Sequence, residues 1–526
     1  MAKNASLRAA SLREALVAWL VLTAVILALL SLSAVLAGAD LGAAAHAVDW
    51  LASLEREDAS GKLSDAAAVV AGVLGIAITV VALVVQLAAT RSGHRITSMF
   101  TREPVNRVVM SLFVLTTLQC LWISVTLDDP NPDAMLPNAG FAITMALITI
   151  SLLVLLPYFI FVFSFLSPLS MIEQLRRRAT RALSRTTRDG IATCQSVVTG
   201  SIDELQEVAR SAIEKSDRAV AIACIDALAE LLVDYQRLRA RLPVEWFRLG
   251  EVIRRDPDFV SWDPSSLAEL DHTGLWFEVK VLHQYRELMS SSLPHARDVA
   301  DMIAINSGRI GVAAADVHPG LATQCIRCFN TYLRTTIRAN DMRTGVNVLN
   351  QYRLVAEALL ARGRLDAVRE IADFFRLYGT FAYREGQSFI LEVAAHDLVQ
   401  LIGAAVTIDS PVVDDLLGRL LELDQEVRQE SQEASLMGVR RAQIQLATLF
   451  IERGDEARAR RIVADLAGER RERLERVRAD LLADQPTQYW EFTPRGLNFA
   501  HLAPERRRHL ATLFGWLDNP EVITAR

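Results

Sequence analysis

The chain has 526 residues, of which 51% are hydrophobic and 22% are charged, and its formal net charge is -6. This length exceeds that of one ordinary domain, so at least two are expected. The negative net charge argues against a general nucleic-acid binder, and no nucleic-acid partner is expected. Five cysteines are too few to form a disulfide framework in a chain of this length.

Four apolar segments precede residue 170, and each is long enough, at about 20 residues, to cross a bilayer. They cover roughly residues 15–37, 66–89, 105–127 and 141–165. Small residues at 33–39 would suit signal-peptide cleavage, but the first apolar region exceeds the roughly 7–15 residues of a signal peptide. The sequence therefore predicts a transmembrane domain of four helices over residues 1–170.

The charges that flank these segments alternate in sign. Arginine or lysine side chains precede the first segment and follow the second and fourth, whereas aspartate and glutamate dominate after the first and third. By the positive-inside rule, both termini are expected in the cytoplasm. Apart from Arg107 at the start of the third segment, which counts among the flanking charges, the segments contain no Asp, Glu, Lys, Arg or His, which argues against a proton-coupled transporter. Pro157 is expected to kink the fourth helix.

Small and polar residues recur along the second segment at alternating four- and three-residue steps, which places them on one face of a helix. Two interpretations stay open. The face packs closely against another membrane helix, or it lines a pore repeated around a ring of subunits. The residues at the centre of this stripe are Gly72, Gly75, Thr79, Ala82 and Gln86.

A basic stretch follows the stripe. Its cationic side chains either contact lipid headgroups and fix the topology, or form a cytoplasmic mouth that concentrates anions. The residues are Arg91, His94, Arg95 and Arg102.

From about residue 171 the pattern is helical almost to the end. We divide it into a membrane-proximal helical segment, 171–242, and a cytoplasmic helical domain, 243–526. A helix is expected over 412–453, with a break near Gly438. Alternation over 276–281 could indicate a strand, but a helix is favoured. Residues 356–375 and 446–466 resemble tetratricopeptide-type hairpins, so the domain is expected to be an irregular, TPR-like or solenoid-like helical stack.

The sequence contains few motifs that indicate catalysis or the binding of a metal or cofactor. Cys325 and Cys328 form a C-x-x-C without further zinc ligands or a redox context, so both are expected to be helix residues. His396 and Asp397 on an apolar helix favour an internal contact over a catalytic pair. No glycine-rich phosphate loop or nucleophile motif occurs, so we expect no enzyme, no cofactor and no metal. The aromatic loop 488–492 is expected to dock on the domain or on a neighbouring subunit.

Two stretches resemble a bacterial family of predicted membrane proteins with a domain of unknown function. One runs from Val85-Gln86-Leu87-Ala88 through Arg95 and Phe100 to Asn106-Arg107, and the other spans Glu207 to Leu228. Where the family carries an Asn-Asp-Pro turn, this chain keeps only Asp217. The resemblance covers roughly residues 1–240. It implies a bacterial inner-membrane protein and a place in a family, without an activity.

The sequence thus predicts an all-α, multi-pass membrane protein. The leading hypothesis is a homo-oligomeric channel or channel-like pore, gated or assembled by the cytoplasmic domain. The alternative is a membrane-anchored scaffold whose helical stack binds a cytoplasmic protein. The expected partners are the lipid bilayer, further copies of the chain and a cytoplasmic protein.

Overall fold

A computed structural model describes residues 56–92, 104–127, 138–165, 167–317, 319–423, 425, 430–483, 486–487, 495–496 and 498–519. These residues form helices, turns and loops, with no strand among them. The predicted all-α fold is confirmed. The chain divides into two compact units, Met1–Met171 and Ile172–Arg526, which are described separately.

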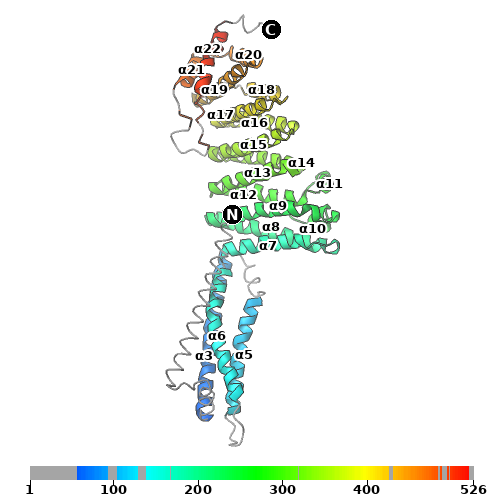
Figure 1. Ribbon diagram of the computed structural model, residues 1–526, viewed down its shortest axis with the longest axis vertical. Helices are drawn as coiled ribbons and strands as arrows, with labels where there is room; N and C mark the ends of the chain where they lie inside the picture. The colour runs from blue at the N-terminus through cyan, green and yellow to red at the C-terminus, as the bar shows by residue number, and fades with distance from the viewer. Residues whose placement is uncertain are drawn as a thin grey trace, which may run out of the picture. The chain divides into compact units, whose positions relative to one another are not determined.

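Unit 1 contains three described helices (Figure 1): α3 (Arg56–Ser92), α5 (Pro104–Leu127) and α6 (Asn138–Phe165). They overlap the predicted segments 66–89, 105–127 and 141–165, and the predicted helix at 15–37 lies outside the described residues. α5 packs against both α3 and α6. Pro157 lies inside α6, which continues to Phe165.

Three stretches of the described residues are long and apolar enough to cross a membrane: Ser64–Leu83, Ile143–Val162 and Ser388–Thr407. The third belongs to unit 2, where 67% of it is buried among other helices, as expected of a core helix. A shorter apolar helix covers Val108–Ile123. The described residues therefore give membrane-length helices in unit 1 but do not establish a set of four.

Unit 2 consists of helices that follow one another in chain order (Figure 1). Neighbours such as α8 and α9 pack together, and alternate helices α13, α15, α17 and α19 pack in succession. The helices are α7 (Pro168–Ser184), α8 (Ile191–Glu214), α9 (Arg218–Leu238), α10 (Glu251–Arg254), α11 (Pro264–Thr273), α12 (Trp276–Ser292), α13 (Arg297–Val317), α14 (Pro319–Arg338), α15 (Met342–Ala361), α16 (Leu365–Arg384), α17 (Ser388–Thr407), α18 (Val413–Leu421), α19 (Glu430–Glu452), α20 (Glu456–Leu466), α21 (Arg471–Leu482) and α22 (Pro504–Asp518).

Several helix boundaries follow recognisable capping signals. Asp217, Asp341 and Asp455 cap α9, α15 and α20 by accepting a hydrogen bond from a backbone N–H three residues later. Gly363 and Gly454 adopt positive φ angles in the turns after α15 and α19. A left-handed conformation carries little cost for glycine, so these turns end one helix and start the next.

The predicted break near Gly438 is wrong. α19 runs through this position without interruption, and the interruption lies between Leu421, where α18 ends, and Glu430, where α19 begins. Glycine is present at 438 because α17 approaches closely there. A Cβ atom at this position would lie 2.1 Å from Cδ of Glu392. Gly438 therefore allows α17 and α19 to pack closely, and it does not form a turn between two helices.

Candidate functional site

The stripe on α3 faces away from the other helices of its unit. α3 packs through Ala67, Val70, Ala77 and Val81, all buried. The stripe residues lie on the opposite side of the helix and are exposed. Of the described atoms, none lies within 4 Å of a Cβ built at either glycine of the stripe. The stripe therefore does not mediate packing among the described helices of one chain. Its residues are Gly72, Gly75, Thr79, Ala82 and Gln86.

The interface between α3, α5 and α6 is apolar and closed. Its core consists of valine, phenylalanine and tyrosine side chains: Val70, Val81, Val109, Phe113, Tyr158 and Val162. The buried hydroxyls of Thr116 and Ser151 bond to each other at 2.9 Å, and the Tyr158 hydroxyl donates to Oδ1 of Asn106 at 2.5 Å. These hydrogen bonds between described residues help to hold the three helices together.

The predicted basic mouth lies almost wholly outside the described residues. Arg91 is in the last turn of α3, one residue before its end at Ser92. His94, Arg95 and Arg102 fall in the stretch between α3 and α5 that the structure does not describe. The mouth therefore stays a prediction.

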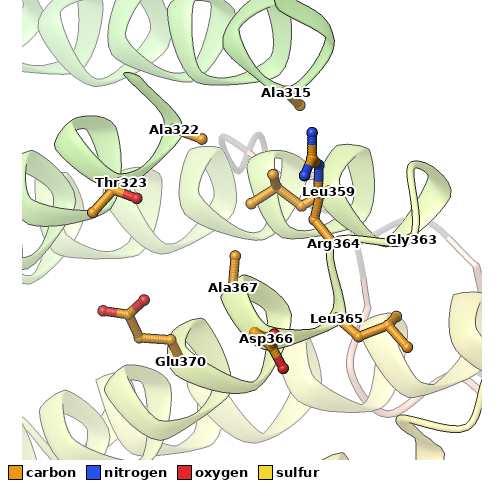
Figure 2. Close-up of a pocket in the computed structure, with 10 residues that line it drawn as sticks. All are labelled: Ala315, Ala322, Thr323, Leu359, Gly363, Arg364, Leu365, Asp366, Ala367 and Glu370. Carbon is orange, nitrogen blue, oxygen red and sulfur yellow. The ribbon is translucent and has the colours of Figure 1, made fainter. Parts of the chain in front are cut away.

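A hollow of about 410 Å³ opens in unit 2 beside the turn between α15 and α16 (Figure 2). Ala315, Ala322 and Thr323 line one side, and Leu359, Gly363 and residues 364–367 and 370 line the other. Arg364 points toward Ala315, whereas Asp366 points away and bonds to Arg369 at 2.7 Å. Among the described residues of this lining, no acid forms a hydrogen bond or ion pair with a base, so the hollow offers shape without a reactive pair.

A buried lysine joins three segments of unit 2. Nζ of Lys280 on α12 lies 2.8 Å from Asp203 on α8, and 2.8 and 2.7 Å from Asp256 and Asp258 in the loop after α10. Burial alone would lower the pKa of Lys280, but the carboxylates of Asp203 and Asp256 raise it above its usual value. The alternating pattern that could indicate a strand has its origin here: Glu278 and Lys280 lie on helix α12, are fully buried and pair with charged residues of other segments.

The end of the chain docks on the middle of unit 2. Arg495 donates from both terminal nitrogens to the buried carboxylate of Asp397, at 2.6 and 2.9 Å, and also to the Val346 carbonyl at 2.8 Å. Phe499 stacks on the ring of His396, with centroids 4.1 Å apart. We call residues 495–496 and 498–503 the C-terminal strap. The predicted docking loop 488–492 lies outside the described residues, but this strap follows it directly.

The strap accounts for His396 and Asp397 on α17. Asp397 pairs with Arg495, while burial, with Arg441 and Arg495 nearby, lowers the pKa of His396 to about 3. The His396–Asp397 dipeptide is thus an internal contact. The sequence around His396 and Asp397 does not identify their partner, because Arg495 lies 98 residues away in the chain.

The C-x-x-C motif lies within α14 (Pro319–Arg338). Cys325 is fully buried and Cys328 is partly exposed. Burial raises the pKa of both thiols, that of Cys328 to about 12, which keeps them protonated and unreactive at neutral pH.

These observations describe a protein with an apolar helical unit and a second unit without an evident catalytic centre among its described residues. Residues 14–199 match the family described as "Predicted membrane protein (DUF2254)". The match confirms the resemblance predicted from the sequence, and it ends within α8 instead of near residue 240. The DUF2254 match covers unit 1 and only the first helices of unit 2.

No curated protein matches the chain. A solved structure titled "Circular tandem repeat protein with novel repeat topology and enhanced subunit contact surfaces" is similar at 16% sequence identity, over 86% of this chain and 93% of that one. The TM-score of 0.28 is too low for this likeness to inform the fold.

Proposed function

We propose that the chain is a membrane-anchored scaffold. Four membrane helices hold it in the bacterial inner membrane with both termini cytoplasmic, and the α3 stripe joins copies into a homo-oligomer. The helices of unit 2 form a solenoid-like stack that binds a cytoplasmic protein. The observation that carries this proposal is the outward direction of the stripe, opposite the face that packs on α5 and α6.

Close packing between copies suits the chemistry of the stripe. Glycine and alanine let two helix backbones approach, which favours association of membrane helices. The hydroxyl of Thr79 already donates to the Gly75 carbonyl at 2.8 Å within its own helix. A pore lining must replace the hydration shell of an ion with oxygen or charged groups. Glycine, alanine and a hydroxyl bonded to its own helix supply little of that.

A pore is the second candidate function, and one observation favours it. Thr79 and Gln86 are exposed on the same side of α3. In a ring of subunits with the stripe turned inward, both side chains would line the axis, with Gln86 near the basic stretch at the cytoplasmic mouth.

Two substitutions separate these functions. Gly75→Leu and Thr79→Leu add bulk to a surface that no described residue of the same chain covers, so the subunit should fold unchanged. In a dry interface between copies, the added bulk costs roughly 1–3 kcal/mol, as in over-packed cores. We expect native mass spectrometry of the full chain in nanodiscs to show an oligomer that both variants convert toward monomers, and planar-bilayer recording to show no conductance.

Val80→Phe is the matched control, because Val80 is exposed on α3 at roughly a third of a turn from the centre of the stripe. It adds similar bulk and should leave assembly intact. Unitary conductance in the wild type, blocked by Thr79→Leu without loss of the oligomer, would establish the pore instead. In that case Gln86→Glu should shift selectivity toward cations. A monomeric wild type would contradict both functions.

A further inference from the structure

Helix α7 follows the last membrane-length helix of unit 1 after two residues, since α6 ends at Phe165 and α7 begins at Pro168. One face of α7 is apolar and buried in unit 2, through Leu175, Ala179 and Leu183. Arg176 fixes this face by pairing with Asp234 on α9 at 2.6 Å. The packing of this apolar face therefore determines which side of α7 points away from unit 2.

The outer face of α7 is a row of arginines. Arg177 and Arg178 are 60% and 51% exposed, and Arg181 and Arg185 are also exposed. Residues 177, 181 and 185 are spaced by four, so they succeed one another along one side of the helix. Arg188, just past the helix, adds a further exposed guanidinium.

This row is only partly neutralised. Glu173 bonds to Arg177 at 2.6 Å but also pairs with Arg176, and Glu204 lies 3.9 Å from Arg178. Arg181 and Arg185 form no ion pair with any residue that the structure describes. The arginine row therefore keeps a positive charge that unit 2 does not balance.

Chain connectivity keeps the start of α7 close to the end of α6. The two linking residues let the start of α7 lie no more than about 10 Å from the end of α6. Within unit 1, α5 runs opposite to α3 and α6 (Figure 1). The end of unit 1 that leads into α7 is consequently the end at which the chain passes from α3 to α5, a stretch that also contains Arg95 and Arg102.

We propose that the outer face of α7, residues 177, 178, 181 and 185, binds anionic phospholipid headgroups of the bilayer in which α6 is embedded. Guanidinium groups bind phosphate through paired hydrogen bonds, and basic clusters beside a membrane helix attract anionic lipids. A surface meant for an acidic protein would not need to start two residues from a membrane helix. The inference is independent of whether the α3 stripe packs against a second copy or lines a pore.

The test uses the full chain in nanodiscs that contain equal amounts of phosphatidylglycerol and phosphatidylcholine. Native mass spectrometry counts the lipids of each kind that remain bound after release. Each basic residue near an anionic surface contributes about a fivefold increase in affinity. Arg177→Gln, Arg181→Gln and Arg185→Gln combined should therefore weaken phosphatidylglycerol retention by roughly a hundredfold. Retention by the wild type should also fall as salt is raised.

A control variant with Arg237→Gln, Arg255→Gln and Arg327→Gln removes three exposed arginines from α9, the end of α10 and α14. It loses the same charge and should retain phosphatidylglycerol as the wild type does. A lysine triple variant at 177, 181 and 185 should keep most of the retention, because the charge is preserved. The proposal would be overturned if the glutamine variant retained as much phosphatidylglycerol as the wild type. It would also be overturned if the control variant lost as much as the glutamine variant, or if the lysine variant lost all retention.

Discussion

Individual residues in unit 2 show how charged groups are accommodated in an all-helical interior. Glu392 on α17 is buried beside Gly438 on α19 and accepts a hydrogen bond from Nη1 of Arg441 at 3.3 Å. Burial, opposed by Arg441, raises the pKa of Glu392 to about 7. The contact between Glu392 and Arg441 is possible only because residue 438 has no side chain, so the position of the Glu392 carboxylate depends on Gly438.

We therefore expect Gly438→Ala to lower the free energy of unfolding by about 1–3 kcal/mol, since the added methyl group displaces the Glu392 carboxylate from Arg441. Urea denaturation of residues 168–526 expressed alone measures this. In a Glu392→Ala background the obstacle is gone, and Gly438→Ala should become neutral or slightly stabilising, because alanine favours the helix.

Gly403→Ala on α17 is the matched control. A Cβ at this position would lie 3.8 Å from Leu449, an ordinary contact, so stability should be unchanged or should increase by up to about 1 kcal/mol. If the changes in the free energy of unfolding caused by the substitutions at 438 and 392 were additive, the proposed coupling between the two positions would be contradicted.

At the scale of helices, the sequence predicted what depends on local pattern and missed what depends on distant contacts. The apolar segments predicted the ends of α5 and α6 to within three residues, because composition alone marks them, whereas α3 begins ten residues before its predicted segment. The direction of the α3 stripe could not be predicted, since it depends on which face of α3 meets α5. The break near Gly438 was misplaced for the same reason: the partner of the glycine lies 46 residues earlier, on another helix.

The contact between α17 and the C-terminal strap makes stability depend on pH. The pKa of His396 falls from 6.5 to about 3 in the folded chain, chiefly through burial. Between these two values the unfolded chain binds the proton and the folded chain does not, so this group destabilises the fold as pH decreases, by up to about 1.4 kcal/mol per pH unit. His396→Phe should remove this contribution while keeping the stacking on Phe499.

Denaturation at several pH values between about 3 and 6.5 tests this, with the slope of the wild type compared with that of the variant. Other groups titrate in the same range, so the difference between the two slopes is the informative quantity. Identical slopes would mean that His396 is protonated in the folded chain.

For the molecule as a whole, the division into two units separates an apolar part from a part with its own core. Unit 2 buries aromatic residues from many helices, including Trp246, Trp276, Tyr332 and Phe375. The apolar face of α7 belongs to this core, because Leu175, Ala179 and Leu183 are buried in it.

Residues 168–526 expressed alone should therefore give a helical circular dichroism spectrum and a cooperative thermal transition. A chain that starts at residue 188 lacks α7 and uncovers the surface beneath it, so its transition should occur at lower temperature. If both chains melted alike, α7 would contribute nothing to the core. Aggregation of the longer chain would show that unit 2 depends on unit 1.

The C-terminal strap has a consequence for the order in which unit 2 acquires its structure. Helices such as α15 and α17 contact near neighbours in the chain, whereas Arg495 reaches Val346 across 149 residues and Asp397 across 98. Closing so long a loop carries a larger entropic cost than pairing adjacent helices, so these contacts are expected to form late. The strap is also synthesised after the helices it touches. Its docking would therefore complete folding and hold together helices that have already assembled.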